Sequence, residues 1–287
     1  MRMRGKGAVL VTGGAGGLGK ACALRFVREG YQVFAGVRDL RKAEELRREA
    51  GPGLTTILLD ITVAEQVKAA AGLVKDSLGQ EAGLVGLINN AGIALSGPLE
   101  FLGLESLRRI FEVNVIGQVS VIQAFLPLLR KCQGRIVNIG SGSGRLALPF
   151  MGGYAASKFA LRALNDSLRR ELRPFGIHVI LIELGFTSTP MGERGISEAK
   201  KSLEALSPEA KDLYSRPFSA GIKVMIKAFE DAAPADKAAE MIFKGFQAKR
   251  PKFRYQAGAH IRKANIPNFL PARWVDRQIW RVLNRNP

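Results

Sequence analysis

The feature that most constrains this chain is a short apolar run that leads directly into a glycine-rich turn. Residues 8–12 are AVLVT, a short apolar run typical of a buried strand. GGAGGLG follows at 13–19, before a helical pattern begins. Gly13, Gly17 and Gly19 have the spacing Gly-x-x-x-Gly-x-Gly, which permits a tight turn and close approach of the backbone to a phosphate. The helix N-terminus would receive a pyrophosphate on its unpaired N–H groups, so the turn predicts dinucleotide binding.

The next part of the chain alternates short apolar runs with longer stretches of helical period. Near-continuously apolar strands that alternate with helices indicate a parallel sheet covered on both faces. The pattern therefore predicts an α/β fold, a single Rossmann-type doubly wound sheet. Further strands are expected near 32–37, 54–59, 84–88, 134–139 and 177–184, and helices near 17–29, 40–50, 63–79, 104–130 and 153–174.

After residue 188 the pattern becomes polar and is interrupted by proline and glycine. We interpret about 188–230 as an inserted, lid-like segment, because it is long for a simple connection. A helix is expected at 234–248 with Pro234 in its first turn, then a short strand within KRPKFRYQAG, then a last helix near 272–284. This gives a dinucleotide-binding catalytic domain over 1–258 and a basic C-terminal extension over 259–287.

The net charge of +18 comes from 43 Lys and Arg against 25 Asp and Glu, and it is unevenly distributed. Residues 244–287 hold eleven basic residues and one acid, Asp276, which accounts for +10. Such a tail raises nucleic acid, anionic lipid or an anionic ligand as partners, although a solvated basic surface is the simplest interpretation. No recognised nucleic-acid module occurs, so we do not expect nucleic-acid binding.

Cysteine and histidine are too sparse for a disulfide framework or a metal site. Cys22 and Cys132 lie far apart, as do His178 and His260, so no metal is expected and a reducing compartment is favoured. No signal-peptide pattern and no uninterrupted apolar run of about 18 residues is present, and the expected location is cytoplasmic.

The end of the second strand bears on cofactor choice. An acid at this position bonds the ribose 2′-hydroxyl of NAD, whereas a nearby arginine suits the 2′-phosphate of NADP. The strand ends at Val37 and Arg38 follows, so NADP(H) is predicted over NAD(H). The alternative is that Arg38 pairs with Asp39 or with a helix glutamate. Asp39 itself is expected to cap the next helix.

The stretch YAASK places Tyr154 and Lys158 four residues apart, on one face of a helix. An ammonium group beside a phenol would stabilise the phenolate and lower the phenol's pKa, so the pair can exchange protons. Alternatively, the tyrosine is packed and the lysine is solvated, as on many helix surfaces.

Taken together, the motifs resemble the short-chain dehydrogenase/reductase family in its classical branch, over about residues 8–190. TGGAGGLG at 12–19 resembles its cofactor turn, NNAG at 89–92 its motif after the fourth strand, and Asn114 its helix asparagine. YAASK resembles its Tyr-x-x-x-Lys pair, and Ser141 lies thirteen residues before Tyr154, a usual separation for its catalytic serine. Ser143 competes for this role but lies two residues closer.

The resemblance implies four catalytic residues: Asn114, Ser141, Tyr154 and Lys158. Tyr154 would be the general acid/base, and Lys158 would lower its pKa and hold the nicotinamide ribose. Ser141 would bond the substrate oxygen, and Asn114 would hold a water that links Lys158 to solvent. The implied cofactor-binding residues are Gly13, Gly17, Leu18, Gly19, Arg38, Asp60, Ile61, Asn90, Ala91, Gly92, Tyr154, Lys158, Gly185, Thr187 and Thr189.

One departure from the family pattern concerns the loop after the sixth strand. The usual Pro-Gly is Leu184-Gly185 here, so φ is no longer fixed before the glycine and looser cofactor placement is expected.

The sequence LALPFMGGYAASK and the tail resemble the hydroxysteroid and retinol dehydrogenase-like branch, which implies a bulky, apolar ketone or alcohol substrate. The implied activity is an NADP(H)-dependent oxidoreductase that interconverts a carbonyl and an alcohol. A non-catalytic dinucleotide-binding sensor, or a membrane- or nucleic-acid-associated protein on the same fold, is the alternative. The family's usual interface, helices 104–130 and 153–174, implies a homodimer or homotetramer.

The last helix combines apolar and basic residues. Trp274, Val275, Ile279, Val282 and Leu283 fall on one side and Arg277, Arg281 and Arg285 on the other, while Trp280 breaks the division. Such a helix either packs over the substrate cleft or a partner subunit, or lies on an anionic membrane as a peripheral contact.

Overall fold

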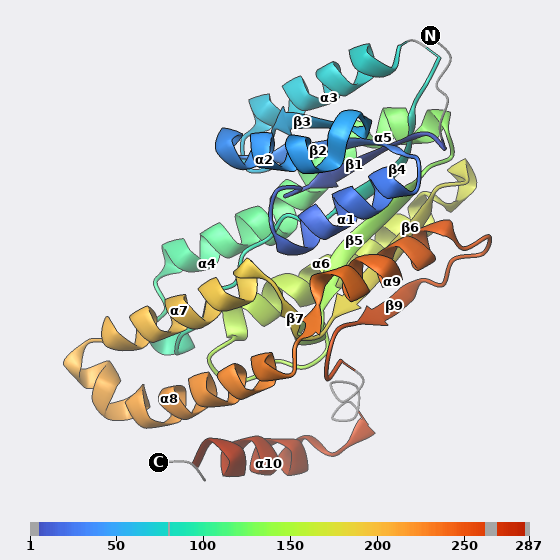
Figure 1. The fold of residues 1–287 in the computed structure, drawn as a ribbon. Helices are drawn as coiled ribbons and strands as arrows, with labels where there is room; N and C mark the ends of the chain where they lie inside the picture. Colours follow the sequence, from blue (N-terminus) through green and yellow to red (C-terminus); the bar gives the residue numbers. More distant parts are fainter. Residues whose placement is uncertain (1–5, 80, 262–268, 285–287) are drawn as a thin grey trace.

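The computed structural model describes residues 6–79, 81–261 and 269–284, and its core is one parallel sheet (Figure 1). Seven strands pair in the order β3-β2-β1-β4-β5-β6-β9, so the predicted Rossmann-type fold is confirmed. All six predicted strands and the short last strand are present. The strands are β1 Ala8–Thr12, β2 Gln32–Val37, β3 Leu54–Leu58, β4 Leu84–Asn89, β5 Arg135–Ser141, β6 His178–Leu184 and β9 Arg254–Ala257. A separate small pairing joins β7 (Thr187–Ser188) and β8 (Ala233–Pro234).

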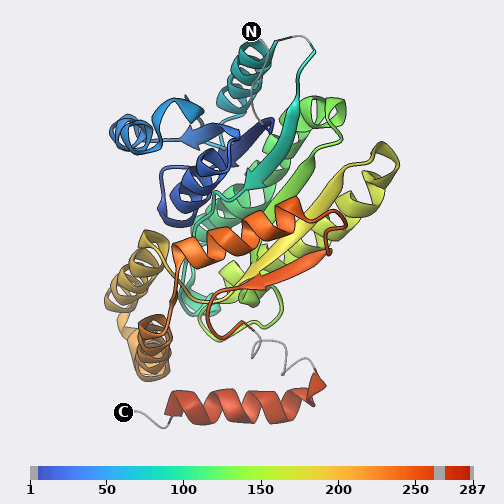
Figure 2. The same cartoon turned by 45° about the vertical axis from the view of Figure 1, so that its right-hand side comes forward.

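Helices cover both faces of the sheet, as the buried strands require (Figures 1 and 2). One face carries α1 (Gly17–Arg28), α2 (Leu40–Ala50) and α9 (Ala235–Gln247). The other carries α3 (Ala64–Leu78), α5 (Gly117–Lys131) and α6 (Gly152–Glu171). Short 3-10 turns lie at Gly51–Gly53, Leu99–Phe101, Gly142–Gly144 and Arg173–Phe175.

The predicted helix near 104–130 is a composite of three pieces. α4 (Leu104–Phe111) continues through a π-helical turn at Glu112–Ile116 into α5. Among the described residues, this stretch is the one helical run long and apolar enough, by composition alone, to cross a membrane; its mean hydropathy is 1.4. Half of that window is buried inside the protein, where α5 contributes to the core.

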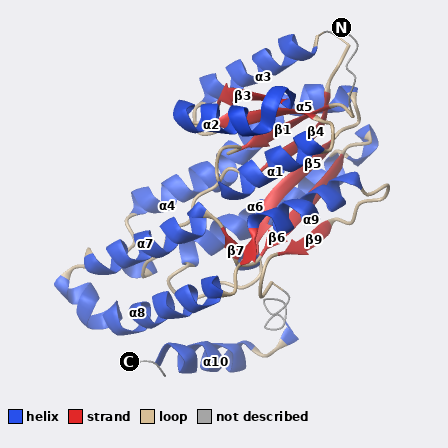
Figure 3. Ribbon diagram, in the orientation of Figure 1, coloured by secondary structure: helices blue, strands red, loops and turns tan. Residues whose placement is uncertain are grey.

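The segment expected to be lid-like forms two helices, α7 (Pro190–Glu204) and α8 (Pro208–Glu230), which extend from the sheet (Figure 3). Two of its three prolines, Pro190 and Pro208, begin helices, and Pro217 lies inside α8 without ending it. Thr189 and Ser207 cap the two helices through their side chains, and proline occupies the first turn of each. The prediction for Pro234 was wrong by one position, because this residue precedes α9 as its N-cap.

The last helix, α10 (Ala272–Asn284), packs beside α8 below the sheet (Figure 1). Leu283 is buried, while Trp274 and Trp280 are about half exposed. The predicted helix near 272–284 is therefore confirmed. Arg285, which was assigned to its basic side, lies outside the described residues.

Candidate active site

The glycine-rich turn meets the NNAG motif at the carboxyl ends of β1 and β4, where the strand order reverses. Ligands bind at this position in open α/β sheets. The buried Thr12 joins the two motifs: its Oγ1 accepts hydrogen bonds from the N–H groups of Asn90 (2.9 Å) and Ala91 (3.0 Å). The Asn90 side chain donates back to the Thr12 carbonyl at 3.0 Å. Thr12 thus holds the turn in register with β4, a role that the sequence analysis did not assign.

The glycines of the turn occupy conformations and spaces that other residues do not fit. Gly13 and Gly17 have φ of +64° and +25°, and a Cβ on Gly19 would lie 2.1 Å from the Gly13 carbonyl oxygen. The N-cap of α1 is Gly16, no side chain caps it, and the first turn contains no acid. The N–H groups of this helix end therefore remain available to an anion, and the turn fits a dinucleotide pyrophosphate.

The end of β2 carries a positive charge beside a carboxylate. Arg38 is about 60% exposed, and its Nη1 lies 3.6 Å from Oδ2 of Asp60. Arg38 therefore does form an ion pair, but its partner is Asp60. The two partners considered from the sequence, Asp39 and a helix glutamate, are not involved. Asp39 instead caps α2 by accepting from the N–H groups of Arg41 and Lys42, which confirms the capping prediction.

Asp60 stays an anion in this setting. Partial burial raises the pKa of its carboxyl, but hydrogen bonds from Thr62 and the nearby Arg38 charge outweigh burial and leave the pKa lowered. Arg38, after β2, and Asp60, after β3, thus form an ion pair in the wall of the cavity described below.

Lys158 is buried, which excludes the alternative of a solvated lysine. Its Nζ donates to the carbonyl of Ile139 at 3.0 Å and lies 5.8 Å from the Tyr154 ring centroid. Because desolvation disfavours the ammonium form, burial lowers the pKa of Lys158 to about 8.

The pKa of Tyr154 departs from expectation. Burial raises the pKa of its phenol, and the hydrogen bond with Ser141 is what opposes this rise. The predicted lowering by Lys158 is therefore not the dominant effect in this structure. Ser141 also accepts a hydrogen bond from the Ser143 N–H at 3.1 Å, so Ser143 acts as a loop residue here.

Asn114 lies in the π-helical turn between α4 and α5, a distortion frequent at functional sites. Its amide exchanges two 2.9 Å hydrogen bonds with the backbone of Ile93 and donates to Ser157 at 3.0 Å. Both polar atoms of the side chain are thereby used. Asn114 ties the segment after NNAG to the helix that carries Tyr154.

One cavity of about 740 Å³ connects these elements. All the cofactor-binding residues expected from the sequence line it except Gly19, and all the catalytic residues expected from the sequence line it except Asn114. Gly19 and Asn114 lie behind its wall and shape it. The cavity continues into a largely apolar part. Ile279, Val282 and Leu283 of α10 line it, as the alternative of packing over the substrate cleft predicts. The other apolar residues of this part were not predicted from the sequence, because they come from separate segments: Leu146, Leu148, Phe150, Met191, Phe218, Ile222, Met225 and Phe229.

The loop after β6 is restrained despite the missing proline. Gly185 donates to the Ala257 carbonyl at 2.8 Å, and Phe186 and Ala259 exchange hydrogen bonds of 3.1 and 3.0 Å. A Cβ on Gly185 would lie 2.0 Å from the Ala259 carbonyl oxygen, so glycine is required there. Hydrogen bonds to the end of β9 and to Ala259 after it thus restrain the backbone here, as a proline would by fixing φ.

Residues 7–200 match the family model described as short chain dehydrogenase. The chain belongs to the short-chain dehydrogenase/reductase family. It is 36% identical over 286 residues to mouse retinol dehydrogenase 5, which covers 96% of this chain and 89% of that protein. It is equally identical over 280 residues to human retinol dehydrogenase 16, covering 96% and 88%. The predicted retinol dehydrogenase-like branch is thereby confirmed, and the protein is an oxidoreductase of alcohols or carbonyls.

Solved structures of the family share the fold. A short-chain dehydrogenase from Streptomyces avermitilis superposes with a TM-score of 0.78 at 24% identity, covering 100% of this chain and 99% of the other. One from Burkholderia cenocepacia in complex with NADP has a TM-score of 0.72 at 26% identity, covering 97% and 99%. One from Burkholderia phymatum in complex with NAD has a TM-score of 0.76 at 23% identity, covering 97% of each chain. A nicotinamide dinucleotide is thus the cofactor type of this fold.

Proposed function

We propose that this protein is an NADP(H)-dependent oxidoreductase that interconverts a carbonyl and a primary or secondary alcohol on a bulky, apolar substrate. The observation that carries the proposal is that Ser141, Tyr154 and Lys158 line the same cavity as the glycine-rich turn. The side chains that can transfer a proton therefore lie in the same cavity as the turn that fits a dinucleotide pyrophosphate.

In this proposal the bound cofactor supplies or accepts the hydride, and the protein supplies proton transfer and orientation. Tyr154 donates a proton to the substrate oxygen during reduction and takes one during oxidation. Ser141 donates a hydrogen bond to the same oxygen, where negative charge develops. Lys158 holds a cofactor ribose, and Asn114 supports the wall through its bonds to Ile93 and Ser157.

The preference for NADP(H) rests on the basic end of β2. Arg38 and Lys42 line the cavity there, and Val37 stands where an NAD-binding protein has its acid. The Burkholderia cenocepacia relative bound to NADP supports this choice, whereas the Burkholderia phymatum relative bound to NAD keeps NAD(H) as the alternative.

The substrate class follows from the cavity wall. Beyond Tyr154 the wall is mostly apolar, with aromatic side chains such as Phe150, Phe218 and Phe229. Apolar walls with few polar groups suit large hydrophobic ligands. A steroid-, retinoid- or lipid-like carbonyl or alcohol fits this chemistry, and the relatives named retinol dehydrogenases support it.

The test is consumption of NADPH by the purified protein on a panel of ketones and aldehydes that includes retinoid and steroid carbonyls. Wild type should turn over at least one bulky substrate, while Tyr154→Phe should still bind NADPH and lose turnover by about 10²-fold or more, which is what proton-transfer catalysis contributes. NADPH binding without turnover anywhere on the panel would favour the non-catalytic sensor.

We further propose that the protein forms a homodimer or homotetramer in the cytoplasm, through the helical run 104–131 and α6. Ile116 and Phe159, on this run and on α6, are large apolar side chains more than 40% exposed, as an interface requires. A monomer in light scattering at micromolar concentration would contradict the assembly.

Peripheral contact with an anionic membrane is a further proposal, and it rests on the outer face of α10. At 3.6 residues per turn, Arg273, Arg277 and Arg281 form one stripe, which is flanked by the half-exposed Trp274 and Trp280. Arginine with interfacial tryptophan is the composition of helices that lie on anionic lipid. Binding to phosphatidylserine vesicles should weaken with salt and be lost in Arg273→Glu/Arg277→Glu. Equal binding to neutral vesicles, or to duplex DNA, would contradict it.

A further inference from the structure

We propose that Arg145 and Glu183 are positioning residues: their ion pair clamps the loop that follows β5 and thereby holds Ser141 in place. The inference rests on the proposed function, because it assigns the clamp to the serine of that site. The two residues are 38 positions apart in the sequence, and neither lies in a motif of the family resemblance.

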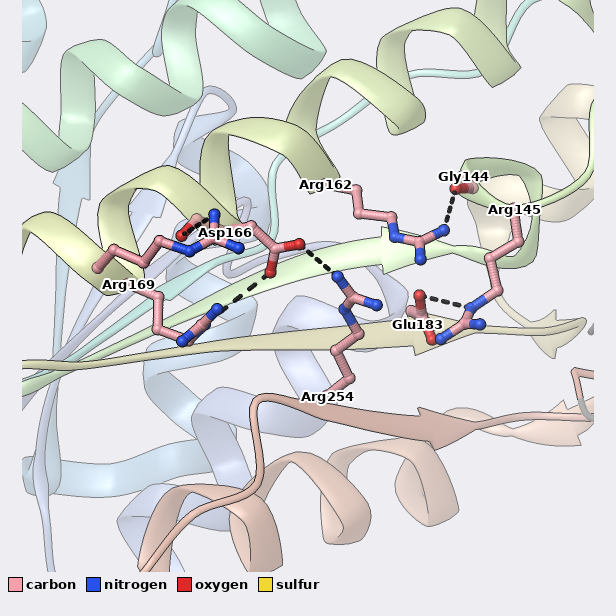
Figure 4. A network of polar contacts seen from close by, with 8 residues as sticks. Gly144, Arg145, Arg162, Asp166, Arg169, Glu183 and Arg254 are labelled. Atoms are coloured by element: carbon pink, nitrogen blue, oxygen red, sulfur yellow. Dashed lines mark hydrogen bonds and ion pairs between the residues drawn. The ribbon is translucent and has the colours of Figure 1, made fainter.

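The clamp joins two neighbouring strand ends (Figure 4). On β6, Glu183 is paired with Gly140 of β5, and the next pair is Leu184 with Ser141. The loop turns after Ser141, and Arg145 donates from Nε to Oε1 of Glu183 at 2.7 Å. The chain is therefore fixed on both sides of the turn, by the β-ladder before it and by the ion pair after it.

A second contact holds the same loop from α6. Arg162 donates from Nη1 to the carbonyl of Gly144 at 3.2 Å (Figure 4). A Cβ on Gly144 would lie 3.0 Å from the Lys158 carbonyl oxygen, so the loop is packed on the turn of α6 that carries Lys158. The loop thus connects Ser141, on β5, with the helix that presents Tyr154.

The burial of the pair indicates a geometric role rather than a stabilising one. The Glu183 side chain is 1% exposed and that of Arg145 18%, and Oε2 of Glu183 has no hydrogen-bond partner among the described residues. Apolar side chains can replace a buried ion pair at no cost in stability, so stability alone does not explain it. Apolar side chains cannot supply a directional bond, and such a bond fixes the position of the loop relative to the end of β6.

A neighbouring ion pair provides a matched control. Arg254 on β9 binds Asp166 on α6, within the same cluster of charges (Figure 4). Both pairs are partly buried and both join distant segments. The Arg254–Asp166 pair, however, forms no hydrogen bond or ion pair with residues 142–146 and acts on that loop only through the charge of Arg162, so it tests what loss of a neighbouring ion pair does.

The clamp has a chemical readout at Tyr154. The hydrogen bond from Ser141 opposes the rise in the pKa of Tyr154 that burial causes. If the loop moves and Ser141 leaves the phenol, the pKa of Tyr154 rises further. A residue that only stabilised the fold would not change this titration.

The experiment compares Arg145→Met/Glu183→Met, Arg254→Met/Asp166→Met, Ser141→Ala and the combination of the first with Ser141→Ala. Both members of each pair are replaced, so that neither is left without the other; Arg169, whose Nε lies 3.9 Å from Oδ1 of Asp166, loses that contact in the control. We expect the clamp variant to lose about tenfold in kcat, part of what one oxyanion donor supplies, with KM and NADPH affinity within about twofold. Combining Arg145→Met/Glu183→Met with Ser141→Ala should lower kcat no further than Ser141→Ala alone.

The phenolate absorbance of Tyr154, taken as the difference from Tyr154→Phe, gives a readout that needs no turnover. The clamp variant and Ser141→Ala should raise the titration midpoint alike, and the control pair should not. Unchanged kcat and titration in a folded clamp variant, an additive loss with Ser141→Ala, or an equal loss in the control pair would overturn the proposal. If wild type lacks turnover, the proposed function fails, and the titration still decides the clamp.

Discussion

The ammonium group of Lys158 donates a 3.0 Å hydrogen bond to the carbonyl of Ile139, two residues before Ser141 on β5. This bond connects α6 to β5, the strand that carries Ser141, and both of its residues line the cavity. Lys158 is therefore part of the framework that sets the distance between Tyr154 and Ser141. Its burial has consequences for stability as well as for chemistry.

Lys158 should make stability rise with pH. Its pKa is about 8 in the folded protein, below its ordinary value of 10.5, so the unfolded chain binds the proton more tightly. The cost of the buried charge is fully present below about pH 8 and is relieved between the two values, by on the order of 3 kcal/mol. Relative to Lys158→Met, wild type should gain stability between about pH 8 and 10.5 in urea unfolding. Parallel curves of unfolding free energy against pH for wild type and Lys158→Met would contradict this. The control is Lys68→Met, at an exposed lysine.

Gly19→Ala should abolish the cofactor turn. The new Cβ would lie 2.1 Å from the Gly13 carbonyl oxygen, so the backbone must move away from its phosphate-binding shape. We expect NADPH affinity in fluorescence titration to fall by at least about tenfold, since the helix N–H groups lose their alignment. Gly72→Ala, where no atom lies within 4 Å, should leave affinity unchanged. Similar affinities of both variants would show that the turn tolerates the displacement.

Arg38→Ala should remove the discrimination between NADPH and NADH. The exposed guanidinium is the charge expected to meet the 2′-phosphate, and a charge-assisted hydrogen bond contributes about 1.5–3 kcal/mol. NADPH affinity should fall by about tenfold or more while NADH affinity stays within about twofold. If both affinities are equal in wild type and do not change, Arg38 serves its ion pair with Asp60 and the NADP assignment is wrong.

Two adjacent residues of α10 should separate cavity function from membrane contact. Ile279 lines the cavity and Trp280 does not, being 57% exposed. Ile279→Ala should raise KM for a bulky substrate by about tenfold, as loss of apolar contact does, and leave a small carbonyl unaffected. Trp280→Ala should keep KM and weaken vesicle binding. Equal KM effects of the two substitutions would show that α10 does not form the substrate wall.

Much of this protein could be predicted from its sequence, because the relevant information is local. Strands such as 8–12 are continuously apolar, and the spacing of Gly13, Gly17 and Gly19 lies within one turn. Even Asp39 as a helix cap depends on residues two or three positions away. The same holds for Tyr154 and Lys158, which are four residues apart and therefore lie on one face of a helix.

What only the tertiary structure decided involves contacts between residues far apart in the chain. Arg38 pairs with Asp60, Arg145 with Glu183, and α10 reaches the cavity across some 120 residues from Tyr154. The pKa of Tyr154 belongs here too, since burial by distant segments outweighs a neighbour four residues away. Desolvation and ion pairing depend on what surrounds a group in space, whereas helical and strand periodicity depend on what adjoins it in sequence.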